Sequence, residues 1–274
     1  MKKLLLSTIS ILLIVVFSAI LFVACSPRAD IDPEEVDVAQ NTYVSQEPIE
    51  ITPISVLSKM EPVTFGKFPQ SLKGDVTVSE KASSDGYYLG SDGKKYYKDG
   101  SLYYLLEDIV WDAYELDSGD ILLISQKILT AARYDDYHDF FEFEKKVFDT
   151  DLFSFTTAET KRVQTIGVEY GTGFSSSTKM KAKLFFINID TITDFYPTTS
   201  KIVKQSTTFA AAKMKSQAGI DADWWLAPSK GRGYYVTNDG VISNKDNTYL
   251  DTSGELTRIA YSRRGIAPAL VISA

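Results

Sequence analysis

Residues 87–125 read YYLGSDGKKYYKDGSLYYLLEDIVWDAYELDSGDILLIS, and they are the strongest indication of how the chain folds. Runs rich in tyrosine, leucine and isoleucine alternate here with turn-forming residues, which is typical of antiparallel strands. The tetrad Ser91-Asp92-Gly93-Lys94 contains the Asp-Gly pair that favours a tight hairpin. In and just before this region the sequence predicts strands over 63–68, 87–89, 95–97, 102–106, 109–114 and 121–125.

Outward from these strands, the rest of the chain mixes short helices with further strands. Residues 138–148 carry aromatic and charged residues at helical spacing, and Thr156-Thr157-Ala158-Glu159 can form a capping box. The expected helices cover 138–148, 157–164, 189–196 and 209–215, and the expected later strands cover 183–187, 224–226, 233–236, 241–243 and 270–272. Because strands and helices do not alternate regularly, we expect a mixed α+β fold and not a parallel doubly wound sheet.

Several motifs, taken in order, resemble a bacterial family of exported domains of unknown function. They are TFGKFPQ at 64–70, IVW at 109–111, ILLIS at 121–125, LFFI at 184–187, DWWLAP at 223–228, GYYV at 233–236 with Asp239-Gly240, and GIAPAL at 265–270. That family is similar to C-type-lectin-like folds such as formylglycine-generating enzyme. The resemblance implies that residues 61–274 form one α+β domain with a small twisted antiparallel sheet, flanking short helices and extensive loops. Members of the family usually have arginine where this chain has Ala267. Any ion pair that this arginine makes in the relatives is therefore expected to be absent here, or to be made by Arg263 or Arg264.

The first 24 residues have the layout of an export signal. Lys2 and Lys3 precede an apolar run over 4–23, and the small Ala24 precedes Cys25. This resembles a bacterial lipoprotein signal, although Phe22 stands where such signals usually have leucine. The resemblance implies a palmitate-bearing lipid on Cys25 and a domain on the extracytoplasmic side of the membrane, in the cell envelope. An uncleaved transmembrane anchor is the alternative.

Residues 25–60 are rich in acidic residues and proline and poor in large apolar residues. Such a segment cannot bury enough surface to offset the entropy lost on ordering. The sequence therefore predicts a lipidated, disordered tether over 25–60, with the folded domain beyond it.

Charge and cysteine content exclude several functions. The formal net charge of -7 leaves no basic field for a phosphate backbone, so a nucleic-acid partner is not expected. Cys25 is the one cysteine, so no intramolecular disulfide can form. Once Cys25 is lipidated no thiol is left, and the cysteine chemistry of formylglycine generation is excluded.

No catalytic constellation stands out in the sequence. His138 is the single histidine, it has no cysteine partners for a zinc site, and no Gly-x-Ser-x-Gly motif supports a serine nucleophile. We expect no catalytic residue, metal or cofactor, and a hydrolase with paired carboxylates is the enzymatic alternative. Asn238-Asp239-Gly240 with Asn244, Asp246, Asn247 and Asp251 could hold calcium through oxygen ligands, but these residue types are more often those of turns.

Aromatic doublets give the best indication of a binding surface. Tyr87-Tyr88, Tyr96-Tyr97, Tyr103-Tyr104, Trp224-Trp225 and Tyr234-Tyr235 would place neighbouring rings on opposite faces of a strand, one inside and one in solvent. By analogy with lectin-like variable proteins, the expected ligand surface comprises Lys230, Arg232, Tyr234, Asn244 and Asn247. The expected function is non-catalytic binding of a glycan, a cell-wall fragment or a protein. An envelope structural or assembly subunit is the alternative.

Overall fold

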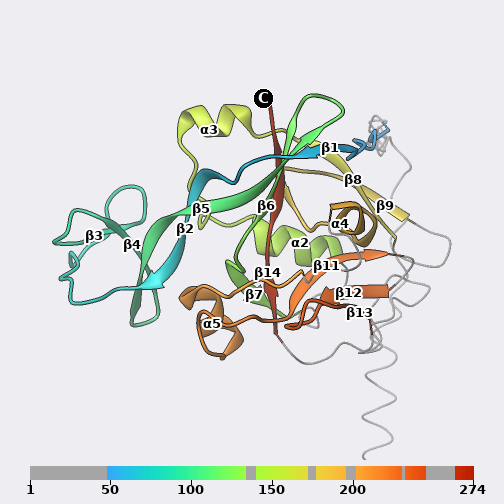
Figure 1. Cartoon of the computed structure of the whole chain (residues 1–274). Helices are drawn as coiled ribbons and strands as arrows, with labels where there is room; N and C mark the ends of the chain where they lie inside the picture. The colour runs from blue at the N-terminus through green and yellow to red at the C-terminus, as the bar shows by residue number, and fades with distance from the viewer. Residues whose placement is uncertain (1–47, 134–139, 172–176, 196–201, 230–231, 245–262) are drawn as a thin grey trace, which may run out of the picture. The chain divides into compact units, whose positions relative to one another are not determined.

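A computed structural model describes residues 48–133, 140–171, 177–195, 202–229, 232–244 and 263–274 (Figure 1). They belong to one compact unit, Pro48–Ala274. The predicted signal over 1–24, the lipidation site Cys25 and tether residues 26–47 lie outside this description. Of the helices described, none has the length and apolar character needed to cross a membrane.

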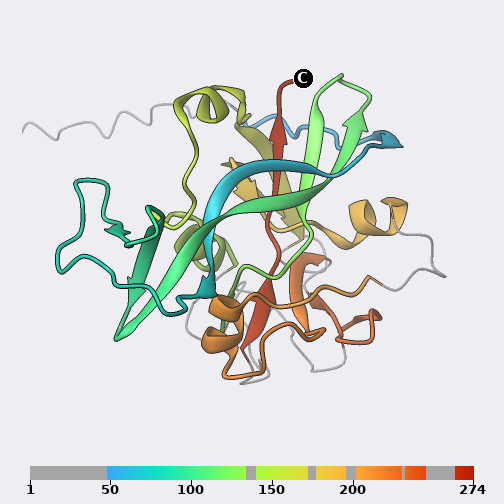
Figure 2. The same cartoon turned by 60° about the vertical axis from the view of Figure 1, so that its left-hand side comes forward.

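The larger sheet has eight strands and is organised around one long strand. Its members are β1 (Val56–Lys59), β2 (Val63–Leu72), β3 (Tyr88–Leu89), β4 (Lys95–Asp99), β5 (Leu102–Leu116), β6 (Ile121–Ser125), β10 (Leu184–Phe185) and β15 (Ala269–Ile272). Strand β5 has 15 residues and pairs with β1 and β2 along one side and with β4 and β6 along the other. Figures 1 and 2 show it running from the centre of the molecule into the hairpin that carries β3 and β4. All pairings in this sheet are antiparallel.

The second sheet has five strands in the order β13-β12-β11-β14-β7. They are β7 (Thr130–Ala132), β11 (Trp224–Ser229), β12 (Arg232–Val236), β13 (Ile242–Ser243) and β14 (Arg264–Ile266). Strands β11 and β14 pair in parallel at Trp224 and Gly265, and the other pairings are antiparallel. A separate hairpin joins β8 (Ile166–Gly171) to β9 (Ser177–Ala182).

The described helices are short. They are α2 (Phe140–Phe148), α3 (Thr157–Arg162), α4 (Ile189–Phe195) and α5 (Thr208–Met214). Strands account for 45% and helices for 15% of the described residues. The expected α+β class, with one small sheet and flanking helices as in C-type-lectin-like domains, is therefore wrong. The physical reason is pairing: the two strands expected over 102–106 and 109–114 are one strand that collects four others, while helices of six to nine residues form no layer of their own.

Individual elements agree better with the sequence. The capping box is confirmed, with the Thr156 side chain accepting from the Glu159 N–H and the Glu159 side chain accepting from the Thr156 N–H. The hairpin at Asp92-Gly93 is also confirmed, because β3 and β4 pair on either side of it. The start of the folded unit differs from the prediction. Strand β1 lies within the segment 25–60, which the sequence predicts to be a disordered tether, and it pairs with β5. The Thr52 N–H also donates to the Gly167 carbonyl at 3.0 Å, so the folded unit begins before residue 61.

The core is rich in aromatic rings. In every tyrosine doublet one ring is buried and the other is partly exposed, as expected; the buried members are Tyr87, Tyr96, Tyr104 and Tyr235. In the tryptophan doublet both rings are buried, because both faces of β11 are covered. The indole N–H of Trp224 donates to the Ile202 carbonyl at 3.4 Å, and that of Trp225 donates to the Ala132 carbonyl at 3.2 Å.

Candidate functional site

The structure places part of the predicted ligand surface at one edge of the five-stranded sheet. Arg232 begins β12, Tyr234 lies two residues further on, and Asn244 directly follows the edge strand β13. The pairing of Tyr235 with Ser243 brings these strands side by side. Lys230 and Asn247 lie outside the described residues. Arg232 and Tyr234 therefore lie on β12, Asn244 lies just beyond the neighbouring strand β13, and the Tyr234 side chain is half-buried.

The interior beside this edge holds a stack built on a buried arginine. The guanidinium carbon of Arg264 lies 3.7 Å from the ring centre of Tyr235 and 4.7 Å from that of Trp225. Its Nε is 3.8 Å from an Asp223 carboxylate oxygen. Arg264 is only 2% exposed. These aromatic and cationic groups thus stabilise the packing of β11, β12 and β14 and offer little surface to a ligand.

The calcium hypothesis concerns the loop that joins β12 to β13. Asn238 and Asp239 form a turn in which the Gly240 N–H donates to the Thr237 carbonyl at 2.8 Å, with Gly240 at a φ of 85°. The side-chain hydroxyl of Thr237 donates to the Asp239 carboxylate. Within the described ranges, no group of three histidine, cysteine or acidic residues is arranged to hold a metal ion. Asp246, Asn247, Asp251 and His138 lie outside those ranges.

An open groove lies elsewhere, along β5, and no sequence pattern predicted it. It has a volume of about 610 Å³ and is lined by Lys67, Gly93, Lys94, Lys95, Leu105, Leu106, Glu107 and Asp108. We call it the β5 groove. Its lining comes from β2, from β4 and the turn before it, and from β5, so segments far apart in sequence meet only through antiparallel pairing.

The β5 groove coincides with an interruption in the sheet. The ladder between β4 and β5 ends at the pair Tyr96–Leu105, and the ladder between β6 and β5 begins at the pair Ser125–Trp111. Among the described strands, none pairs with residues 106–110 on this side of β5. The Gln126 N–H closes one end of the interruption by donating to the Val110 carbonyl at 3.0 Å. Residues 106–109 therefore present a short stretch of strand edge to the groove.

Charged side chains surround this edge. The Lys67 ammonium donates to the Asp108 carboxylate at 2.6 Å, and Lys95 forms an ion pair with Asp85. The Lys95 ammonium, together with hydrogen bonds from Ser83 and the Tyr87 N–H, holds the pKa of Asp85 well below its usual range. Lys94 is exposed and forms no ion pair with the described carboxylates. The groove therefore has a cationic rim in which one lysine is available to a ligand.

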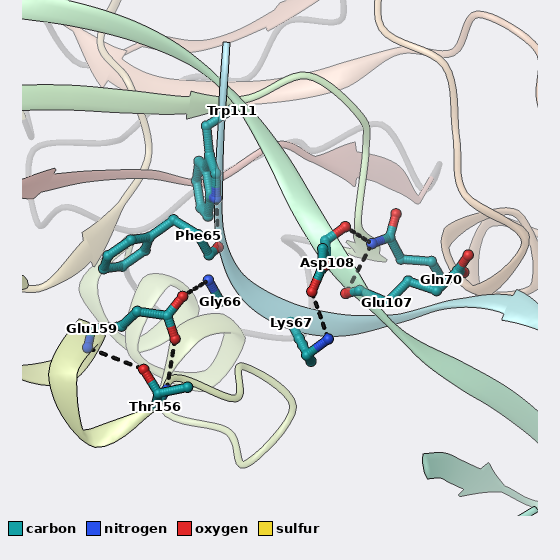
Figure 3. Close-up of polar contacts among 9 residues, drawn as sticks. All are labelled: Phe65, Gly66, Lys67, Gln70, Glu107, Asp108, Trp111, Thr156 and Glu159. Atoms are coloured by element: carbon teal, nitrogen blue, oxygen red, sulfur yellow. Dashed lines mark hydrogen bonds and ion pairs between the residues drawn. The ribbon is translucent and has the colours of Figure 1, made fainter. Parts of the chain in front are cut away.

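The framework that positions Lys67 is a bulge in β2 (Figure 3). Gly66 has a φ of 66°, and its N–H donates to Glu159 Oε1 at 2.7 Å. The Trp111 indole N–H donates to the Phe65 carbonyl at 2.7 Å. The side-chain amide of Gln70 donates to the Asp108 and Glu107 carbonyls at 2.8 and 3.3 Å. These contacts hold the β2 bulge against β5 and α3.

Two buried groups with large pKa shifts, Glu144 and Lys204, lie in the core and not in the β5 groove. Burial raises the pKa of Glu144 on α2 to about 8, although its carboxylate accepts the Tyr170 hydroxyl at 2.5 Å and the Phe186 N–H at 3.3 Å. Burial lowers the pKa of Lys204 to about 8. The Lys204 ammonium donates to the Ser125 carbonyl at 2.5 Å and lies 5.3 Å from the Trp224 ring centre.

Comparisons with known proteins add no assignment: no family model matches the chain, and neither the curated proteins nor the solved structures include a significant match.

Proposed function

We propose that the chain is an exported lipoprotein whose folded unit binds a ligand without transforming it, and that the β5 groove is its binding site. The observation that carries this proposal is the open groove, built on the hydrogen-bonded β2–β5 framework and rimmed by lysines. Its volume of about 610 Å³ falls within the range typical of ligand sites, roughly 300–1,000 Å³.

The distribution of titratable groups supports binding over catalysis. Catalytic acids and bases generally combine a shifted pKa with access to a cleft. Glu144 and Lys204 have large pKa shifts, but both are buried in the core and neither lines the groove. The carboxylates that do line it have structural partners, since Asp108 pairs with Lys67 and Glu107 accepts the Ser71 N–H at 2.8 Å.

The β5 groove is preferred to the surface around Tyr234 as the binding site because it exposes more charged side chains to a ligand. The aromatic rings beside Tyr234 are packed against Arg264 inside the sheet. The groove instead exposes Lys67, Lys94, Lys95 and Asp108 around the half-buried Leu105. Polar groups around an apolar floor are the usual composition of a binding site.

The test uses the full chain in detergent, applied to one array of glycans, peptidoglycan fragments and peptides, with calcium and with chelator. We expect a specific signal that Lys94→Glu reduces at least tenfold. Lys181→Glu, which reverses an exposed lysine on β9, is the matched control and should leave binding unchanged. A ligand whose binding is equally insensitive to both variants would show that the site is elsewhere.

A further inference from the structure

We propose that the β5 groove takes an extended, acidic peptide segment, which adds to residues 106–109 of β5 as a short strand. This inference rests on the proposed function, in which the groove is the ligand site. It adds the class of ligand and the way in which the ligand is held.

The backbone of β5 supports strand addition. In an antiparallel strand, the N–H and C=O of one residue point to one neighbour and those of the next residue point to the other. The Val110 carbonyl accepts from Gln126 on the β6 side, and the Tyr103 carbonyl accepts from the Lys73 N–H on the β2 side. Residues of even number therefore face the interruption, so Leu106 and Asp108 direct their backbone groups into the groove.

Part of this edge is already in use, which limits the length of an added strand. The Asp108 carbonyl accepts from the Gln70 side chain at 2.8 Å. The ladder with β4 also uses the Leu106 N–H, because the pair Tyr96–Leu105 is flanked by a hydrogen bond from that N–H to the Lys95 carbonyl. The Leu106 C=O and the Asp108 N–H are the groups that the described ladders leave to a ligand. The turn before β4 lies at one end of the interruption and Gln126 at the other. At about 3.3 Å per residue, the edge accommodates roughly four ligand residues.

The charges at the groove indicate an acidic ligand. Lys67, Lys94 and Lys95 line it, while the carboxylates of Asp108 and Glu107 are engaged with Lys67 and the Ser71 N–H. A carboxylate on the ligand would meet Lys94 without displacing an ion pair within the described structure. A basic segment would be repelled by the same rim, so charge contributes to selectivity as well as to affinity.

The floor of the groove favours a peptide over a glycan. Sugar rings are commonly bound by stacking on exposed tyrosine or tryptophan, and the described lining residues include no aromatic side chain. Leu105 and Leu106 form the apolar part of the lining instead. They can contact alternate side chains of an added strand, as in other complexes formed by strand addition.

The experiment measures binding of octapeptides in three charge classes, acidic, neutral and basic, to the full chain in detergent. We expect binding in the acidic class, at least tenfold tighter than in the basic class, and a loss of at least tenfold in Lys94→Glu but not in the control Lys181→Glu. Backbone N-methylation of the best peptide should abolish binding at alternate positions only. Hydrogen exchange of the Asp108 N–H, which faces the groove, should slow when the peptide binds.

The other outcomes separate this inference from the proposed function. Acidic peptides that tolerate N-methylation at every position would overturn strand addition. Glycan binding that is sensitive to Lys94→Glu, without peptide binding, would overturn the peptide class and leave the groove as a binding site. A folded chain that binds neither peptides nor glycans would overturn both proposals.

Discussion

At the scale of single residues, two buried ionisable groups make stability depend on pH in opposite ways. Glu144 and Lys204 are 1% and 3% exposed. Burial penalises the charged form of each, so the carboxyl holds its proton to a higher pH and the amine loses its proton at a lower pH than in the unfolded chain. Their joint effect is to make stability lowest near pH 8.

For Lys204, we expect the free energy of unfolding to rise as the pH increases above 8. The unfolded chain keeps the proton up to about pH 10.5, whereas the folded chain releases it near pH 8. Higher pH therefore favours the folded state, by at most about 1.4 kcal/mol per pH unit. Urea unfolding between pH 8 and 9.5 should show this slope in the wild type and lose it in Lys204→Met. The exposed Lys127→Met is the control, and an unchanged slope in Lys204→Met would contradict the prediction.

For Glu144, we expect the reverse. The folded chain keeps the carboxyl proton to about pH 8, while the unfolded chain releases it near pH 4.5. Stability should therefore fall as the pH rises from 5 to 8, and Glu144→Gln should remove this part of the decline. Denaturant unfolding across that range measures it, with the exposed Glu142→Gln on the same helix as control. A decline of equal size in Glu144→Gln and the wild type would exclude Glu144 as its source.

At the scale of elements, one carboxylate connects a strand bulge to a helix. Glu159 accepts the Thr156 N–H to cap α3 and also accepts the Gly66 N–H in the β2 bulge, both at 2.7 Å. The capping box is readable from Thr156 and Glu159 because they are three residues apart. The contact between Glu159 and Gly66 cannot be predicted from local sequence, because 93 residues separate them and only the folded chain brings them together.

The bulge gives a direct prediction for Gly66. A Cβ there would lie 2.5 Å from the Phe155 ring, at a positive φ that other residues adopt at a cost. We expect Gly66→Ala to lower the free energy of unfolding by about 2 kcal/mol or more, measured by urea denaturation. Gly74→Ala is the matched control, because an added Cβ there meets nothing within 4 Å. Equal stability in the two variants would mean that the bulge does not constrain the fold.

At the scale of the whole molecule, local sequence patterns predicted individual strands, turns and helix caps well, but they did not predict how the strands pair into sheets. The 121–125 strand, the Asp92-Gly93 hairpin and the α3 cap depend on neighbouring residues, and the structure confirms them. The fold class depends on β5. Two of the expected strands join to form it, and four other strands pair with it. No local sequence pattern encodes such pairings. The β5 groove was missed for the same reason, because Lys67, Lys94 and Asp108 meet only in the assembled sheet.

The proposed membrane anchor belongs to this scale and depends on Cys25. We expect Cys25→Ser to abolish metabolic labelling with palmitate and to release the chain from the membrane fraction, because the thioether lipid would be its attachment. The fold of residues 48–274 should be unaffected, since Cys25 lies outside that unit. Undiminished labelling of the variant would refute the lipoprotein proposal, and unchanged membrane association without labelling would favour an uncleaved anchor.

The order of strands along the chain constrains when folding can finish during synthesis. Strand β15 lies between β10 and β6, and β14 lies between β11 and β7, so the latest strands in the chain are interior members of their sheets. Neither sheet can close until residues 264–272 have emerged from the ribosome. Before then, strands β6, β10, β11 and β7 have open edges. A nascent chain of this design stays incompletely folded until those residues are available, and its open strand edges depend on protection from aggregation until then.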